Sequence, residues 1–401
     1  MTVPEIWAGI DGGKTHHHCA AIDTSATQLL SRRVANDEPP LLELIAEVVE
    51  LADGEPVTWA VDLNGGGAAL LIALLVGHGQ RVVYLPGRTV HHASATYRGN
   101  GKTDAKDATV IADQARMRRD LQPLVVADEL STELKILTAR RADLVADRTR
   151  QINRLRAQLL EYFPSLERSF DFSASKAALV LLTGYQTPSA LRRAGTTRLE
   201  AWLKKRKVRN AATVATTALA AAESQHTTVP GKALAASMVA RLAKGVMTLD
   251  QEIAETDTLI EDRFHRHHHA EVITSLPGMG TLLGAEFLAA TGGNMTAFGS
   301  PDRLAGVAGL APAPRDSGRI SGNLHRPQRY SRRLLRVFYL SALVSIRCCP
   351  ASRAYYDRKR AEGKRHVQAI LALARRRLNV LWAMLRDGST YQPTPAASAA
   401  A

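Results

Sequence analysis

The sequence predicts an α/β domain at the N-terminus, a long helical middle region and a mainly α-helical C-terminal domain. Short apolar segments separated by turn residues open the chain, and helices and strands then alternate. From residue 134 onward, apolar residues recur at the three- and four-residue spacing of helices. The length agrees, because 401 residues with 45% apolar and 22% charged residues suffice for one or two buried cores.

The N-terminal domain is predicted over residues 1–125. Three short strands open it, over residues 5–11, 17–23 and 28–34, and the first ends on Asp11. A helix over residues 41–51 then leads to the apolar strand "PVTWAVDL", which ends on Asp62, followed by a second helix and the strand "RVVYLP". Three antiparallel strands followed by alternating helix and strand is the order of a ribonuclease-H-like α/β fold.

The middle region, residues 126–270, reads as two long helices around an insertion. One apolar stripe lies over residues 131–163, and a second contains Leu242, Val246 and Ile260. Two such helices predict an antiparallel coiled-coil arm, and a plain helical bundle fits the pattern nearly as well. Residues 165–233 between them read as a small helical module with a basic face, to which no motif assigns a chemistry.

The C-terminal domain is predicted over residues 271–388, followed by a disordered, low-complexity tail over residues 389–401. A Pro-Gly-x-Gly turn at residues 277–280 lies between two apolar helices. This is the pattern of a helix-hairpin-helix, in which backbone N–H groups meet a DNA phosphate, and a plain αα-hairpin remains the alternative. The Pro-, Gly- and Arg-rich segment 310–330 is predicted as a loop.

Positive charge is concentrated near the C-terminus. The net charge is +14, and residues 312–386 alone hold 18 Lys and Arg against 3 Asp and Glu. A positive field confined to one segment is typical of nucleic-acid binding, because cations that neutralise phosphates release counterions. A solvated basic surface is the alternative. The candidate nucleic-acid-binding residues are Arg315, Arg319, Arg326, Arg329, Arg332 and Arg333.

Four aspartates are candidate metal ligands. Asp11 and Asp62 each lie at the C-terminal end of a predicted central strand, at the edge of an α/β sheet where active sites gather. Thr103 is a plausible N-cap, and Asp104 and Asp107 then share the first turn of a helix. Alone, that pair would be explained by the preference for acids at a helix start. Four acids together suit Mg²⁺ or Mn²⁺ and an in-line phosphoryl transfer.

The histidine runs, the cysteines and one glycine-rich motif give weaker indications of function. The histidine runs at residues 16–18 and 265–269 have no matching Cys or acid spacing, so we expect no metal site there. Three cysteines, no apparent targeting segment and no stretch of about 20 apolar residues predict a cytoplasmic protein with no membrane contact. "GIDGGKT" is similar to the first phosphate loop of actin-like sugar kinases and ATPases, but no adenosine loop follows.

The combined motifs resemble one family. An N-terminal "GID", a second acid after a later strand, "KTDAKDA", the Pro-Gly-x-Gly turn and "LAGVAGLAPAPRDSG" before an Arg-rich helix resemble the IS110 family of insertion-sequence transposases. The resemblance covers residues 5–120 and 270–385. It implies a RuvC-like N-terminal domain with DEDD acids, a coiled coil, and a C-terminal domain with a serine nucleophile. It maps the acids to Asp11, Asp62, Asp104 and Asp107, with Asp62 in place of the usual Glu, and the nucleophile to Ser317.

The resemblance also implies partners and a mechanism. Members act on donor and target DNA, are guided by a structured bridge RNA, and assemble from homodimers into homotetramers in which the serine domain of one protomer meets the RuvC-like domain of another. Mg²⁺ held by the acids would polarise the scissile phosphate while Ser317 attacks it. Two alternatives stay open: a RuvC-like endonuclease or resolvase that uses water, and a nucleic-acid-binding scaffold whose acid cluster has decayed.

Overall fold

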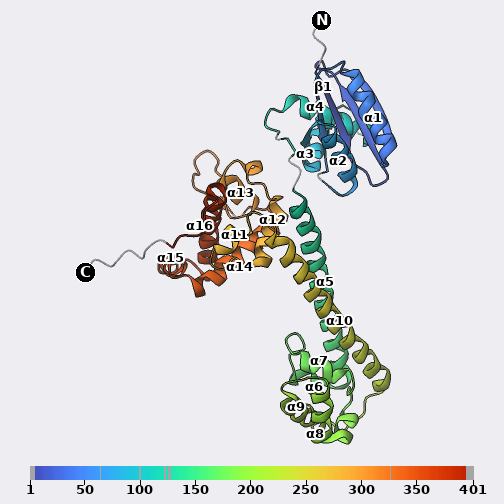
Figure 1. The fold of residues 1–401 in the computed structure, drawn as a ribbon, viewed down its shortest axis with the longest axis vertical. Helices are drawn as coiled ribbons and strands as arrows, with labels where there is room; N and C mark the ends of the chain where they lie inside the picture. The colour runs from blue at the N-terminus through green and yellow to red at the C-terminus, as the bar shows by residue number, and fades with distance from the viewer. Residues whose placement is uncertain are drawn as a thin grey trace, which may run out of the picture. The chain divides into compact units, whose positions relative to one another are not determined.

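A computed structural model of the chain describes residues 5–63, 65–98, 101–121, 123–124, 128–325 and 327–393 (Figure 1). The chain divides into two compact units, residues 1–126 and residues 127–401, and each has its own hydrophobic core. The first unit is mixed α/β and the described part of the second is mostly helical, as the sequence predicts.

The first unit is built on a five-stranded sheet in the order β3-β2-β1-β4-β5. The strands are β1 (Ile6–Asp11), β2 (His16–Ile22), β3 (Gln28–Ala35), β4 (Val57–Val61) and β5 (Arg81–Tyr84). β2 runs antiparallel to β1 and β3, whereas β4 runs parallel to β1 and β5. The predicted order of three antiparallel strands followed by alternating helices and strands is therefore confirmed.

Helices cover both faces of this sheet (Figure 1). They are α1 (Glu38–Leu51), the 3-10 turn η1 (Gly66–Ala68), α2 (Ala69–Gly77), α3 (Gly87–Ser94) and α4 (Asp104–Met117). α1 and α2 bury Leu44 and Leu71 against one face, and α3 and α4 bury Val90 and Ile111 against the other. α1 begins three residues before its predicted start because proline is tolerated in the first turn of a helix. α3 was not predicted.

Two long antiparallel helices open the second unit, α5 (Glu129–Tyr162) and α10 (Lys232–His265). Ion pairs join them: Arg140–Glu252 at 3.0 Å, Arg141–Asp257 and Arg148–Asp250. Their predicted apolar stripes are largely buried, Leu144 and Val246 among them. The helix pair is thus as expected, and the knobs-into-holes packing of a true coiled coil stays a prediction.

A helical module lies between these two helices in the sequence. It contains α6 (Pro164–Ser169), α7 (Lys176–Leu182), α8 (Pro188–Lys205) and α9 (Ala211–Glu223). Leu181, Leu199 and Ala218 belong to its core, which also takes in the adjoining ends of α5 and α10. The Tyr162 hydroxyl at the end of α5 donates a hydrogen bond to the Gln186 carbonyl at 2.9 Å. The module is therefore firmly attached to the arm.

The remaining helices form one core. They are α11 (Ala270–Ser275), α12 (Thr281–Thr291), the 3-10 turn η2 (Thr296–Phe298), α13 (Pro301–Val307), α14 (Arg332–Cys348), α15 (Pro350–Ala361) and α16 (His366–Asp387). Among the described residues no single helix has the length and apolar character to cross a membrane. Only α14 and α15 taken together, bent by 105°, meet those two criteria.

The Pro-Gly-x-Gly turn lies between α11 and α12, where the sequence places it. Gly278 has a φ of 79°, and a Cβ there would lie 2.7 Å from the Ser341 carbonyl oxygen of α14. This glycine therefore serves close packing of the turn against α14. A contact of this turn with a DNA phosphate stays a prediction.

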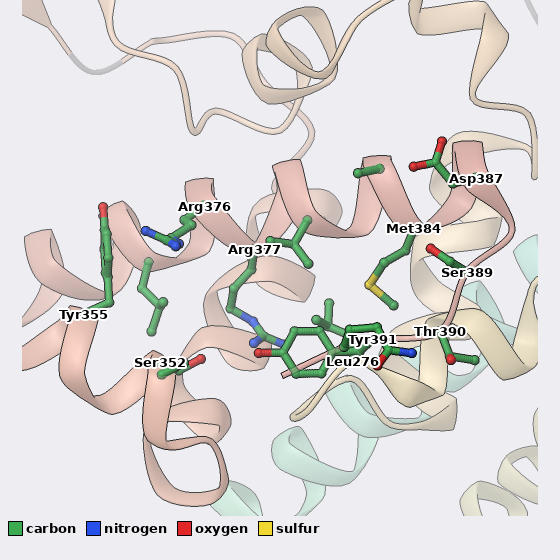
Figure 2. A pocket seen from close by; sticks show the side chains of 15 residues that line it. Leu276, Ser352, Tyr355, Arg376, Arg377, Met384, Asp387, Ser389, Thr390 and Tyr391 are labelled. Carbon is green, nitrogen blue, oxygen red and sulfur yellow. The ribbon is translucent and has the colours of Figure 1, made fainter. Parts of the chain in front are cut away.

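Buried Arg377 of α16 joins the turn to α14. Its guanidinium donates to the Ser341 hydroxyl and to the Pro277 carbonyl, and it lies beside a cavity of about 310 Å³ (Figure 2). Ser389 and Tyr391 line this cavity, and the Tyr391 N–H donates to the Ser275 hydroxyl at 2.9 Å. The chain is therefore packed against the protein as far as Tyr391, past residue 389 where the tail was predicted to start, because Tyr391 lines this cavity and bonds to Ser275. Residues 394–401 lie outside the described residues.

Candidate active site

Asp11 and Asp62 lie side by side at one edge of the sheet. β1 and β4 are parallel neighbours in which Ile10 pairs with Val61, so the next residue of each chain segment is an aspartate at the same edge. Asp62 Oδ1 accepts a hydrogen bond of 2.9 Å from the Gly12 N–H, which joins the segments after the two strands. The edge predicted from the sequence is thus the edge on which both side chains are found.

α4 brings Asp104 and Asp107 to this edge. The Thr103 hydroxyl accepts from the Lys106 N–H at 3.2 Å, which is the predicted N-cap. A Cβ on Gly9 of β1 would lie 2.2 Å from the Ala108 carbonyl oxygen of α4, so helix and strand touch backbone to backbone. Asp104 lies one turn before Ala108 and follows the same face of the helix.

The other three aspartates all influence the ionisation of Asp11. Burial and, after it, the negative charges of Asp62, Asp104 and Asp107 together raise the pKa of Asp11 to about 6, with Lys102 opposing them. Burial likewise raises the pKa of Asp62, against the hydrogen bond from Gly12. Carboxylates that repel one another in this way form a strongly negative, half-buried edge.

The donor set suits a hard divalent cation. Carboxylate oxygens are the ligands that Mg²⁺ and Mn²⁺ prefer, and a cation would relieve the repulsion that raises the pKa of Asp11. Within the described parts of the chain, no three His, Cys, Asp or Glu side chains are grouped closely enough to hold a metal ion. The residue types and the repulsion between their charges therefore fit a metal ion. The side chains, as they are positioned, do not by themselves form a complete set of metal ligands.

His17 and Asn36 support this edge, and sequence reasoning missed both roles. Buried His17 accepts a hydrogen bond from the Gly13 N–H at its Nδ1, 3.2 Å away, and burial lowers its pKa. Asn36 donates to the Lys14 carbonyl at 3.1 Å and to the Gly67 carbonyl at 2.8 Å. These bonds hold the segments after β1 and β4 together. The two Asn36 bonds join residues that are 22 and 31 positions apart in the sequence, and no local motif predicts such contacts.

The segment that carries Ser317 folds as a β-hairpin rather than as the predicted loop. β6 (Ala313–Pro314) pairs with β7 (Leu324–His325), and the Arg315 N–H extends the pairing to the Asn323 carbonyl at 2.9 Å. Ser317 and Ile320 then exchange two backbone hydrogen bonds, of 3.2 and 2.9 Å, around Gly318. This turn holds Ser317 at the exposed end of the hairpin. Among the described residues, its hydroxyl has no hydrogen-bond partner.

Five of the six candidate arginines around this hairpin are described, and no carboxylate among the described residues neutralises them. Arg315, Arg319, Arg329 and Arg332 are exposed and Arg333 is half-buried, while Arg326 lies outside the described residues. In the part of the chain that the structure describes, none of these five forms an ion pair. Nearby Arg336, by contrast, pairs with buried Glu286 at 2.5 Å. The hairpin thus offers a surface that a phosphate backbone would neutralise.

Two family models match the chain, one over each of the segments described above. Residues 8–164 match the family model of the DEDD transposases of IS110 elements, described as "Transposase", and residues 270–357 match that described as "Transposase IS116/IS110/IS902 family". The first match contains Asp11, Asp62, Asp104 and Asp107, and the second contains Ser317.

Three relatives are similar over almost their whole length. The chain is 68% identical to the insertion element IS900 uncharacterized 42 kDa protein of Mycobacterium paratuberculosis, over 98% of this chain and 99% of the relative. It is 54% identical to the insertion element IS116 uncharacterized 44.8 kDa protein of Streptomyces clavuligerus, over 97% of each. It is 37% identical to the insertion element IS110 uncharacterized 43.6 kDa protein of Streptomyces coelicolor, over 96% of this chain and 95% of the relative.

Proposed function

The chain belongs to the IS110 family of transposases, and from that premise we propose that it cleaves and rejoins DNA through a serine nucleophile assisted by a divalent cation. As a transposase it is an enzyme of DNA recombination, and DNA is its substrate. The observation that carries the proposal is the placement of Asp11 and Asp62 at the same edge of the sheet, where α4 packs against β1.

We assign the metal to these carboxylates. Asp11, Asp62, Asp104 and Asp107 would hold Mg²⁺ or Mn²⁺, which supplies positive charge to the scissile phosphate. The protein's own contribution is to fix the ligands: Gly12 orients Asp62, and the contact at Gly9 sets the position of α4. Asp62 is one methylene shorter than the glutamate usual in the family, and its Oδ1 accepts the hydrogen bond from Gly12.

We assign the nucleophile to Ser317. Its oxygen would attack the phosphorus, the P–O bond to the leaving strand would break, and a phosphoserine ester would keep the bond energy for rejoining. The hydroxyl proton passes to water, and the leaving oxygen takes a proton in turn. Arg315, Arg319 and Arg326 would offset the charge of the transition state, and Arg329, Arg332 and Arg333 would bind the flanking backbone.

Denaturing electrophoresis with end-labelled DNA tests the nucleophile. With Mg²⁺, we expect label to stay on the wild-type protein and on Ser321→Ala, a change of the other exposed serine of the same hairpin, but not on Ser317→Ala. An adduct with Ser317→Ala would refute the assignment. Asp104→Asn should abolish adduct formation as well as free cleavage.

One observation favours a second candidate function. Among the described residues, the Ser317 hydroxyl has no hydrogen-bond partner that could act as its base, which is also what a water-using RuvC-like resolvase would show. In that case Ser317→Ala would cleave DNA as fast as the wild type, and no label would remain on any protein. A scaffold without activity would leave the DNA intact with every metal. The sugar-kinase alternative is set aside, because the chain belongs to a transposase family.

Guidance by a bridge RNA and assembly from homodimers to homotetramers are further parts of the proposal, and they rest on the family resemblance. Sequencing of RNA that co-purifies with the protein, compared with the DNA flanking its gene, tests the first. Light scattering with and without DNA tests the second.

A further inference from the structure

The helical module between α5 and α10 concentrates positive charge on one side. Residues 165–231 contain ten Lys and Arg against four Asp and Glu, and eight of the ten lie between Arg192 and Arg209. Two of these eight are engaged within the protein: Arg192 donates to the Gln225 carbonyl at 2.6 Å, and Lys204 pairs with Glu200. The other six are exposed and form no ion pair among the described residues: Arg193, Arg198, Lys205, Arg206, Lys207 and Arg209.

The helix geometry orders these cations. Arg198, Trp202 and Arg206 follow at intervals of four residues, so they form one row along α8, with Lys205 beside it. Lys207 and Arg209 continue the positive charge into the turn before α9. We call Arg198, Lys205, Arg206, Lys207 and Arg209 the basic face. Its helical row is about 12 Å long, and a nucleic-acid duplex carries about seven phosphates over that length.

An aromatic stack fixes the middle of the basic face. The Arg206 guanidinium carbon lies 3.6 Å from the ring centre of Trp202, and Tyr185 meets the same indole edge-on, with ring centres 5.1 Å apart. A Cβ on Gly184 would lie 2.3 Å from this indole, so the glycine leaves the space that the ring fills. A guanidinium held flat in this way loses little entropy when it binds a phosphate.

The surroundings disfavour other anionic partners. A membrane-binding face needs large apolar side chains beside its cations, and in the described residues 165–231 none is exposed. Of the module's acids, Glu167 pairs with Arg156 and Glu200 with Lys204, so neither offsets the exposed charges. The substrate of the enzyme is itself a polyanion.

We propose that the basic face of the module binds the phosphate backbone of a nucleic-acid duplex, as a contact separate from the carboxylates and from the Ser317 hairpin. The ligand chemistry is the phosphodiester backbone, which DNA and RNA share. Such a contact carries no sequence information and positions the duplex. The proposal stands independently of the assignments of metal and nucleophile.

A triple variant of the full chain tests it. Arg198→Gln, Lys205→Gln and Arg209→Gln together remove three charges, and leave Arg206 in its stack and Lys207 at its positive φ. Fluorescence anisotropy with a 30-base-pair DNA duplex and with an RNA hairpin, without divalent metal, should show affinity for at least one of them reduced by about tenfold. The slope of log K against log salt should fall by up to about three.

A matched control changes three exposed cations of the arm that also lack ion pairs among the described residues: Lys135→Gln, Arg154→Gln and Arg241→Gln. We expect this control to bind within about twofold of the wild type. Loss with DNA alone, or with RNA alone, supports the proposal and identifies the source of the backbone. Unchanged binding of both probes, or an equal loss in the control, overturns it.

Two measurements distinguish a loss of nucleic-acid binding from a loss of folding and from a failure of the proposed chemistry. The melting temperature should be the same for all three proteins, because every changed side chain is exposed. Lys205→Glu alone provides a second binding variant, with a larger change of charge at its one site. Ser317→Ala should bind both probes as the wild type does. A failure of the proposed chemistry would therefore appear in the adduct assay and not here.

Discussion

A Cβ atom on Gly9 would lie 2.3 Å from the backbone nitrogen of Ala112, so β1 and α4 are in direct contact at this point. Asp11 lies two residues along the strand, and Asp104 two turns back along the helix. The distance between the two backbones at Gly9 therefore sets how the carboxylates of α4 approach Asp11.

Gly9→Ala should displace α4 and disrupt the carboxylate site. Overpacking at such a contact costs about 1–3 kcal/mol, and denaturant unfolding should show a loss of that size together with loss of metal-dependent cleavage. Gly77→Ala in α2 is the control, because a Cβ there meets nothing within 4 Å. A Gly9→Ala protein with wild-type stability and cleavage would show that the contact does not position the site.

The raised pKa of Asp11 predicts a dependence of stability on pH. A carboxyl whose pKa is higher in the folded state, here about 6, stabilises the fold at low pH and loses that contribution as pH rises from its ordinary value through 6. In chelator at pH 8, Asp11→Asn should therefore be more stable than the wild type, by on the order of 1–2 kcal/mol after allowance for solvent screening. The difference should vanish near pH 4.

Divalent metal should reverse this order. Mg²⁺ or Mn²⁺ should raise the melting temperature of the wild type at pH 8 and leave that of Asp11→Asn nearly unchanged, because binding to the native state stabilises it. The increase should shrink as the pH falls through 6, where protons compete for Asp11. An equal increase in both proteins would place the metal elsewhere.

Asp62 combines a structural role with the proposed metal role, and two substitutions separate them. Asp62→Asn keeps an oxygen that can accept from the Gly12 N–H and loses the charge, whereas Asp62→Ala loses both. With a chelator at pH 8, we expect Asn to be at least as stable as the wild type, because it removes a half-buried charge. Ala should be about 1–2 kcal/mol less stable than Asn, because it also loses the hydrogen bond. Both should lose metal-dependent cleavage. If Asn cleaves normally, the charge of Asp62 is not needed.

Arginines with and without partners should respond in opposite ways. Arg329 is exposed without an ion pair among the described residues, so Arg329→Gln should weaken DNA binding and reduce the salt slope by about one. Arg336→Gln leaves buried Glu286 without its partner and should cost about 1–3 kcal/mol of stability. Its DNA affinity should change little. Anisotropy titrations and urea unfolding of both variants separate the two outcomes.

The sequence was sufficient for the elements that local pattern determines. The strand that ends at Asp11, the strand that ends just before Asp62 and the N-cap at Thr103 depend on apolar patterning and on capping, which neighbouring residues specify. Their convergence could be anticipated because parallel neighbouring strands end at the same edge of a sheet.

Local sequence patterns could not predict the contacts between segments that are distant in the sequence. Nothing near Gly9 in the sequence indicates that Ala108 and Ala112 lie against it, and the bonds of Asn36 to Lys14 and Gly67 have no periodicity. The Ser317 hairpin was missed for another reason. Its strands have two residues each, too short for alternation, and side-chain bonds of Asp316 and Asn323 hold it together.

These bonds predict that Asp316 positions Ser317. Asp316 Oδ1 accepts from the Asn323 N–H at 2.9 Å, and the Asn323 amide donates to the Arg315 carbonyl at 3.3 Å, so the two strands are joined just before the turn that carries Ser317. Asp316→Ala frees that turn. The rate of adduct formation should fall about tenfold or more, with DNA affinity equal or slightly higher, since a negative charge is removed. Asp316→Asn should restore much of the rate, because an amide oxygen can accept the same N–H. A rate equal for Ala and wild type, or no recovery with Asn, would show that this hydrogen bond does not hold the serine in place.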